Sequence, residues 1–156
     1  NKNILNEIMA NKNREAKIIF QKLNWMNENQ SEVLEDNDFQ KATVFIASDV
    51  VYDDLITIYF FKCLFKLMTS GNKTKKVCYI ANEKRINFNI ENLSVQDTAY
   101  DYFIKNLDEL NDFYDEETGF TFKCEEIKDC LNIEKFIRSY KRNEYLYLWR
   151  IECSPI

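Results

Sequence analysis

Short apolar runs alternate along the chain with segments of helical periodicity, and this pattern predicts a mixed α/β fold. Residues 42–48 (ATVFIAS) are apolar almost without interruption, which is typical of a strand buried on both faces. Runs rich in β-branched and aromatic residues predict five strands, at residues 17–23, 42–48, 75–81, 120–127 and 145–153.

Apolar residues at helical spacing predict helices over residues 3–14, 55–69 and 97–110. Asp53 or Asp54 is suited to cap the second of these, and Gly71 is suited to end it. Residues 27–40 are polar and acidic and predict a loop. Residues 131–140 predict a short helix or a loop.

The order of these elements predicts one α/β sheet. The last two strands are separated by a short connection, whereas a parallel crossover needs a dozen or more residues. We therefore expect the final strand, residues 145–153, to run antiparallel. Its alternation of polar and apolar residues predicts a position near an edge of the sheet.

The composition excludes several kinds of catalytic and metal-binding site. The 156 residues contain no histidine, which excludes Ser-His-Asp and Cys-His catalysis and most zinc sites. The five cysteines form no Cys-x-x-Cys pair and predict reduced, buried thiols in an intracellular protein. The net charge of −5 argues against a surface that follows a phosphate backbone. No apolar stretch reaches the length of a membrane span.

Several short motifs, taken in their order, resemble the lysine-methylating family 16 of seven-stranded methyltransferases. The stretch ASDVVYDD resembles that family's Asp/Glu-x-x-Tyr motif, and FQKLNW resembles its strand ending in Leu-Asp-Trp. The stretch from Asn82 to Phe103 narrows the resemblance to the methyltransferase-like protein 22 group. The motifs lie at residues 2–6, 20–25, 47–54, 82–103 and 147–152.

The resemblance implies a doubly wound, Rossmann-like sheet with an antiparallel last strand. The family's glycine-rich cofactor loop and its ribose-binding acid are absent, since the only glycines are Gly71 and Gly119. We therefore expect residues 1–156 to be the C-terminal portion of one methyltransferase domain, without strands 1 and 2, and to bind cofactor poorly alone. The expected strand order is 42–48, 75–81, 145–153 and 120–127, with a bare apolar edge at residues 42–48.

The stretch FIASDVVYDD holds the predicted site, because ligands of doubly wound sheets bind beyond the carboxyl ends of the strands. By the resemblance, Asp49 and Tyr52 are the catalytic candidates. The cofactor candidates are Trp25, Ser48 and Asn24. No metal site is predicted. Without the resemblance, Asp49 is more simply a helix-start residue. Trp25 suits the core as well as it suits an adenine wall, and packing is the alternative for Tyr52. Asp53 and Asp54 suit capping and solvent exposure better than metal binding. Tyr100, Tyr102 and Phe103 are predicted core residues, and residues 83–85 are either a substrate guide or a solvated turn.

The implied activity is S-adenosylmethionine-dependent methylation of a protein lysine. Nucleic-acid amino methyltransferases carry two prolines where this chain has Val50 and Val51, which counts against a flipped base as substrate. A non-catalytic interaction domain is the third alternative. The resemblance suggests a nuclear, nucleic-acid-associated protein as partner, no direct nucleic-acid or membrane binding, a monomer when full length, and a nuclear or cytoplasmic location.

Overall fold

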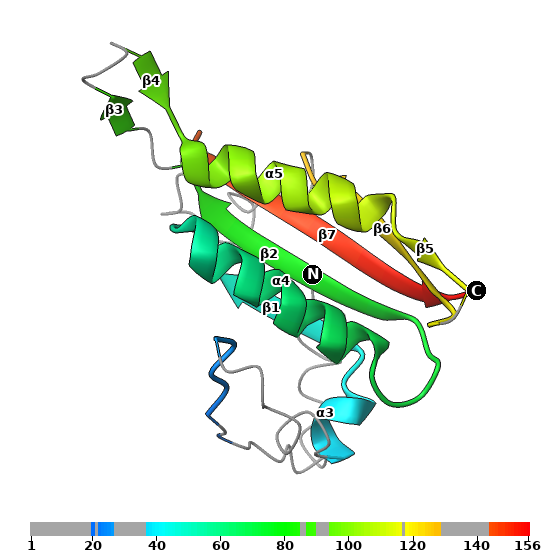
Figure 1. The fold of residues 1–156 in the computed structure, drawn as a ribbon. Coiled ribbons are helices and arrows are strands. Elements are labelled where there is room, and N and C mark those ends of the chain that lie inside the picture. The colour runs from blue at the N-terminus through cyan, green and yellow to red at the C-terminus, as the bar shows by residue number, and fades with distance from the viewer. Residues whose placement is uncertain are drawn as a thin grey trace, which may run out of the picture.

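A five-stranded sheet forms the centre of the molecule (Figure 1). The computed structural model describes residues 20, 22–26, 37–84, 87–89, 94–116, 118–128 and 144–156. The sheet order is β1-β2-β7-β6-β5. Among the described strands of this sheet, only β1 and β2 pair in parallel, and β7 runs antiparallel to both of its neighbours. This confirms the predicted order of the four main strands and the antiparallel last strand. The strands are β1 (Val44–Ser48), β2 (Lys76–Glu83), β5 (Tyr114–Asp115), β6 (Phe120–Glu126) and β7 (Leu146–Pro155).

Two helices, α4 (Asp54–Thr69) and α5 (Thr98–Asn111), lie on the same face of the sheet (Figure 1). The side chain of Asp53 accepts a hydrogen bond from the Ile56 amide at 3.0 Å, so Asp53 is the N-cap of α4. Past the other end of α4, Gly71 has a φ of +72°, as predicted for the residue after the helix. A side chain there would also collide with the backbone oxygen of Gln40 at 2.6 Å.

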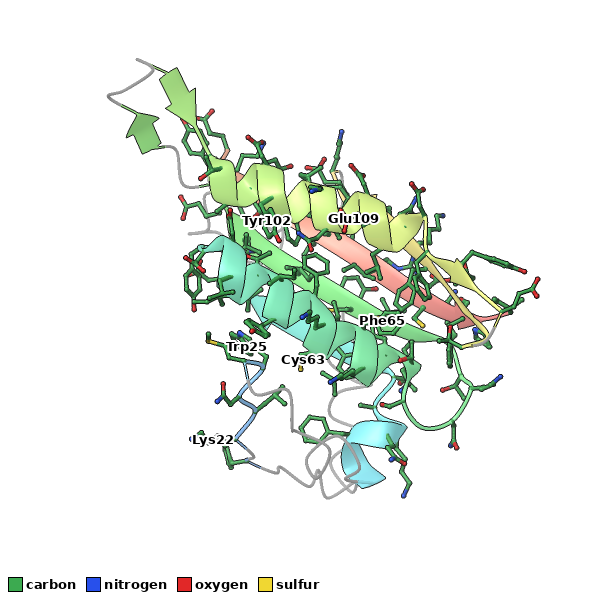
Figure 2. The ribbon with its side chains drawn as sticks, in the orientation of Figure 1. Lys22, Trp25, Cys63, Phe65, Tyr102 and Glu109 are labelled. Carbon is green, nitrogen blue, oxygen red and sulfur yellow. The ribbon has the colours of Figure 1, made fainter. Side chains whose placement is uncertain are left out.

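The core lies between these helices and the sheet and is rich in aromatic rings. Phe103 is fully buried and contacts the rings of Phe61 and Tyr147. The predicted core positions Phe103 and Tyr100 both belong to this packing, which confirms them. Tyr102 is half-buried on α5 and lies outside the cluster, so that prediction was wrong (Figure 2). None of the described helices is both long and apolar enough to cross a membrane.

The strand β1 is buried on one face only, so the prediction of burial on both faces was wrong. Phe45 and Ala47 pack towards α4, whereas Val44 is 58% exposed and Ile46 is 82% exposed. Both described long helices cover the opposite face, and β1 pairs with β2 alone among the described strands. The apolar sequence therefore indicates that these side chains favour burial, but it does not indicate which element covers them. Among the described strands, β1 lies at the edge of the sheet with exposed apolar side chains, as predicted.

The strand β7 lies at the centre of the sheet, between β2 and β6, and not near an edge as predicted. Its alternation has another cause. One face packs under the helices, and the other carries a charged cluster. Arg150 pairs there with Glu125 at 2.8 Å and also with Glu152, and Glu152 pairs with Lys75. Ion pairs across neighbouring strands thus replace apolar packing on this face.

Several elements were not predicted, or lie outside the described residues. The helix α3 (Asn37–Lys41) occupies part of the segment predicted as a loop. The strands β3 (Asn87–Asn89) and β4 (Ser94–Gln96) pair as a small separate sheet. Their three-residue length gives no recognisable periodicity, and the same holds for β5. Lys22 and Leu23 are not in a strand. The rest of the predicted strand 17–23 lies outside the described residues, apart from Phe20, as do the predictions for 3–14, 27–36 and 131–140.

Four cysteines, at positions 63, 78, 124 and 153, are free thiols as predicted, and Cys130 lies outside the described residues. Burial raises the pKa of Cys78 to about 12 and that of Cys153 to about 11. In the unfolded chain a thiol ionises near its ordinary pKa of 9.0. The stability that these thiols contribute by staying neutral is therefore fully present below that pH and is lost as the pH rises towards the folded pKa values.

We expect the free energy of unfolding to fall between about pH 8 and pH 11, and to fall less steeply in Cys78→Ala. The alanine variant will be less stable at neutral pH because it leaves a small cavity, but it removes one titrating group. Urea titrations of both proteins across this pH range measure the two slopes. Parallel slopes would contradict the assignment of alkaline instability to the buried Cys78 thiol.

Candidate functional site

The chain leaves the sheet at Asp49, immediately after β1. Asp49 has a φ of 54°, the left-handed conformation that Asp and Asn tolerate better than most residues. Its backbone N–H donates to the Ala81 carbonyl at 2.9 Å, so the ladder between β1 and β2 continues to this residue. The side chain is exposed at the carboxyl end of the sheet. This is where ligands bind in doubly wound sheets.

Two buried valines follow, and they hold the next turn in place. Val50 and Val51 belong to the buried residues of the core, at 9% and 3% exposure. Tyr52 then emerges with 45% of its surface exposed. Asp53 caps α4, so its carboxylate has a structural partner, as the alternative interpretation predicted. Asp49 and Tyr52 are thus both exposed, on either side of two buried valines in the sequence.

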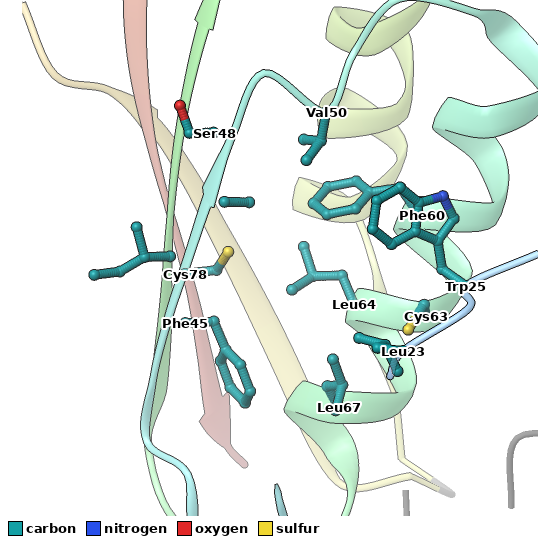
Figure 3. Close-up of a pocket in the computed structure, with 12 residues that line it drawn as sticks. Leu23, Trp25, Phe45, Ser48, Val50, Phe60, Cys63, Leu64, Leu67 and Cys78 are labelled. Atoms are coloured by element: carbon teal, nitrogen blue, oxygen red, sulfur yellow. The ribbon is translucent and has the colours of Figure 1, made fainter. Parts of the chain in front are cut away.

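A cavity of about 300 Å³ lies beside β1 (Figure 3). Phe45 and Ser48 line it from β1, and Phe60 lines it from α4. Leu23 and Trp25 reach it from the segment that precedes α3. Trp25 packs edge-on against Phe60, with ring centroids 6.1 Å apart. Trp25 and Ser48, two of the predicted cofactor residues, therefore line the same cavity.

The third predicted cofactor residue, Asn24, makes a local contact. Its Oδ1 accepts a hydrogen bond from the Met26 amide at 3.3 Å, and it is exposed. It is not among the residues that line the cavity. The structure thus places Trp25 and Ser48 on one cavity, with Asp49 directly after Ser48, and leaves Asn24 outside the cavity lining. Their roles stay predictions.

Tyrosine rings and carboxylates surround the same end of the sheet. Burial raises the pKa of Tyr147, and the carboxylates of Asp97 and Asp49 raise it further. Tyr100 packs against Tyr147 with ring centroids 4.7 Å apart, and its pKa is raised mainly by burial. The ammonium of Lys84 lies 4.0 Å from the centroid of the Tyr100 ring. A cation is therefore already stabilised by an aromatic ring at this edge.

Sequence reasoning did not single out Asn82 or Tyr147, which lie opposite each other in β2 and β7. Asn82 is buried, and its Oδ1 accepts a hydrogen bond from the Val50 amide at 2.9 Å. The available signal was the alternation of β2. Asn82 continues the inward-facing series of Cys78 and Ile80, so a polar side chain stands where an apolar one is expected. In the described part of the chain, no three Cys, Asp or Glu side chains are grouped to hold a metal ion.

Sequence comparisons show which family the chain resembles. The profile of a family described as lysine methyltransferase matches residues 1–109. Methyltransferase-like protein 22 of Homo sapiens is 30% identical over 120 residues, which cover 76% of this chain and 28% of that protein. Its Mus musculus counterpart is 31% identical over 119 residues, covering 75% of this chain and 28% of that protein. The chain thus matches under a third of each relative's length, and no solved structure matches it significantly. The five-stranded sheet is a partial Rossmann-like methyltransferase sheet, and the chain belongs to the lysine methyltransferase family.

Proposed function

We propose that this chain is the C-terminal portion of the catalytic domain of an S-adenosylmethionine-dependent protein-lysine N-methyltransferase. The observation that carries the proposal is the position of Asp49. In a chain of this family, an exposed carboxylate stands at the carboxyl end of the parallel strand β1, in a turn anchored by buried residues. Ser48, the residue before it, lines the neighbouring cavity.

The cofactor that the family implies fits the described residues in part. The cavity beside β1 is lined by Trp25 and Phe60, which suit a flat, apolar ring, and by the small side chain of Ser48. None of the described lining residues is acidic, so none of them supplies a carboxylate for the ribose hydroxyls. The described residues therefore suit the adenine end of the cofactor. When bound, S-adenosylmethionine supplies an activated methyl group on a positively charged sulfur.

The residues around β1 suit the other reactant, a lysine amine. A lysine is mostly protonated at neutral pH because its pKa is about 10.4. The amine must therefore lose a proton to solvent, either before or after it binds, before it reacts. Asp49 accepts a hydrogen bond from the amine, orients its lone pair and stabilises the positive charge that builds on nitrogen. The ring of Tyr52 packs against that charge, a contact worth about 0.5–2 kcal/mol. Neither residue acts as a strong base, which suits a chain without histidine.

The substrate in this proposal is a protein. The middle positions of the motif, Val50 and Val51, are buried in the core, and neither supplies the proline-shaped slot for a flipped base. We further propose a nuclear, nucleic-acid-associated protein as the substrate and a nuclear or cytoplasmic location for the enzyme. We propose that the full-length protein acts as a monomer.

The test is methylation of a cell lysate by the full-length protein with methyl-labelled S-adenosylmethionine. The proposal expects label that survives nuclease, is removed by protease, and is recovered as methyl-lysine after acid hydrolysis. Label recovered in nucleic acid would reject the proposal in favour of an amino methyltransferase. A full-length protein that neither binds the cofactor nor transfers label would instead be a non-catalytic interaction domain.

A further inference from the structure

Asn82 supplies a hydrogen-bond acceptor at the end of the β1–β2 ladder. The Asp49 amide donates to the Ala81 carbonyl, as a parallel ladder requires. The left-handed turn at Asp49 then carries the chain out of the sheet, so the next amide, that of Val50, loses its strand partner. Val50 is buried, and an unpaired amide there would cost about 1–3 kcal/mol. The Oδ1 of Asn82 accepts this hydrogen bond at 2.9 Å.

Asn82 is itself held from the other side. Its exposed fraction is 2%, and Tyr147 lies directly opposite in β7. The Asn82 side chain lies near enough to the Tyr147 hydroxyl to lower its pKa against the larger effect of burial. Asn82 is therefore held between the Val50 amide, which donates to its Oδ1, and the Tyr147 hydroxyl beside it.

We propose that Asn82 is a positioning residue for methyl transfer: by holding the Val50 amide, it fixes the turn that presents Asp49 to the substrate amine. The inference rests on the function proposed above. A displacement of about 1 Å at a reacting group can cost about 100-fold in rate. Loss of this single hydrogen bond therefore affects turnover, although Asn82 itself touches neither reactant.

The test compares Asn82→Leu with Asn82→Asp in the full-length protein. Leucine has a similar size and cannot accept the hydrogen bond, whereas aspartate keeps an oxygen in the same place. We expect Asn82→Leu to speed hydrogen–deuterium exchange in peptides that cover residues 48–52 by about tenfold, and Asn82→Asp to restore slow exchange. We expect kcat for a methyl-accepting substrate to fall about 10- to 100-fold in Asn82→Leu, with KM for S-adenosylmethionine changed less than about threefold.

Asn111→Leu is the matched control. The Oδ1 of Asn111 accepts a hydrogen bond from the Cys124 amide at 2.9 Å, the same pair of groups at a different part of the sheet, in an exposed position where that of Asn82 is buried. This variant is expected to keep kcat within about twofold of the wild type. Equal losses of kcat in both variants, or unchanged exchange at residues 48–52 in Asn82→Leu, would overturn the inference. An inactive wild-type protein would reject the proposed function instead, and the exchange result would still decide whether Asn82 fixes the turn.

Discussion

Replacing Asp49 by Asn is expected to lower methyl transfer by the full-length protein about 100- to 1,000-fold while the fold stays intact. Removing one preorganised electrostatic group at a reaction centre typically costs this much in kcat. Asparagine matches aspartate in shape and tolerates the φ of 54° found here. The substitution therefore removes the charge and leaves the turn. Single-turnover methylation, with circular dichroism and thermal unfolding in parallel, measures both effects.

Two further variants separate charge from backbone strain. Asp49→Gly is compatible with the left-handed turn and also lacks the carboxylate, so it should be as inactive as Asp49→Asn. Asp53→Asn removes an equal charge four residues away but keeps a good N-cap for α4, so activity and stability should both remain near wild type. If Asp49→Asn retains wild-type turnover, Asp49 is only a turn residue and the site assignment is wrong.

The sequence predicted that Ser48 and Asp49 lie at the carboxyl end of a strand, but it did not predict the backbone conformation there. Asp49 stood out because a polar residue ends an apolar run inside a recognisable motif. Its left-handed backbone depends on where the chain must turn after its last hydrogen bond to β2, which is a tertiary constraint. Asn82 is one polar residue in the run NEKR, and only the pairing of β2 with β1 and β7 reveals that it faces inward.

The fold shows the same division between pattern and context. The strand order followed from the resemblance and from the short final connection, and the structure confirms it. The burial of β1 and the central place of β7 were predicted wrongly. Side-chain periodicity indicates which positions favour burial, but it does not indicate which elements pack on each face of a strand. The pair Lys75 and Lys76 illustrates this. One lysine pairs with Glu152 on the open face of the sheet, and the other is buried under the helices.

Lys76 is expected to give the largest change in stability of any single lysine in the described part of the chain. It is 0% exposed, and its Nζ donates to the carbonyls of Leu67 and Ser70 at 2.9 and 2.5 Å. These are among the last carbonyls of α4, which have no partner within the helix. A cation at the negative end of the helix dipole also favours the folded state. Lys76 therefore caps α4 from the adjacent strand.

We expect Lys76→Met to lower the free energy of unfolding by about 2–3 kcal/mol at neutral pH. Methionine fills similar space but cannot donate, and each buried carbonyl left without a donor costs about 1–3 kcal/mol. Ser70 loses the Lys76 partner for its carbonyl, whereas the Leu67 carbonyl also accepts from the Ser70 hydroxyl. The control is Lys75→Met. Its lysine is mostly exposed, and its ion pair should contribute less than about 1 kcal/mol.

The pH dependence supplies an independent check on the same residue. Burial lowers the pKa of Lys76 from its ordinary value of 10.5, so the charged form is less favoured in the folded protein than in the unfolded chain, even with the two carbonyls that it contacts. A lowered pKa contributes stability that is present above the unfolded value and is lost as the pH falls through the folded value. The stability difference between wild type and Lys76→Met should therefore grow as the pH rises towards 10.5. Cys153 interacts electrostatically with Lys76, so the comparison is made in a Cys153→Ala background, in which the other thiols titrate alike in both proteins. A Lys76→Met variant as stable as the wild type at neutral pH, with a difference that does not change with pH, would show that the apolar part of this side chain alone supports α4.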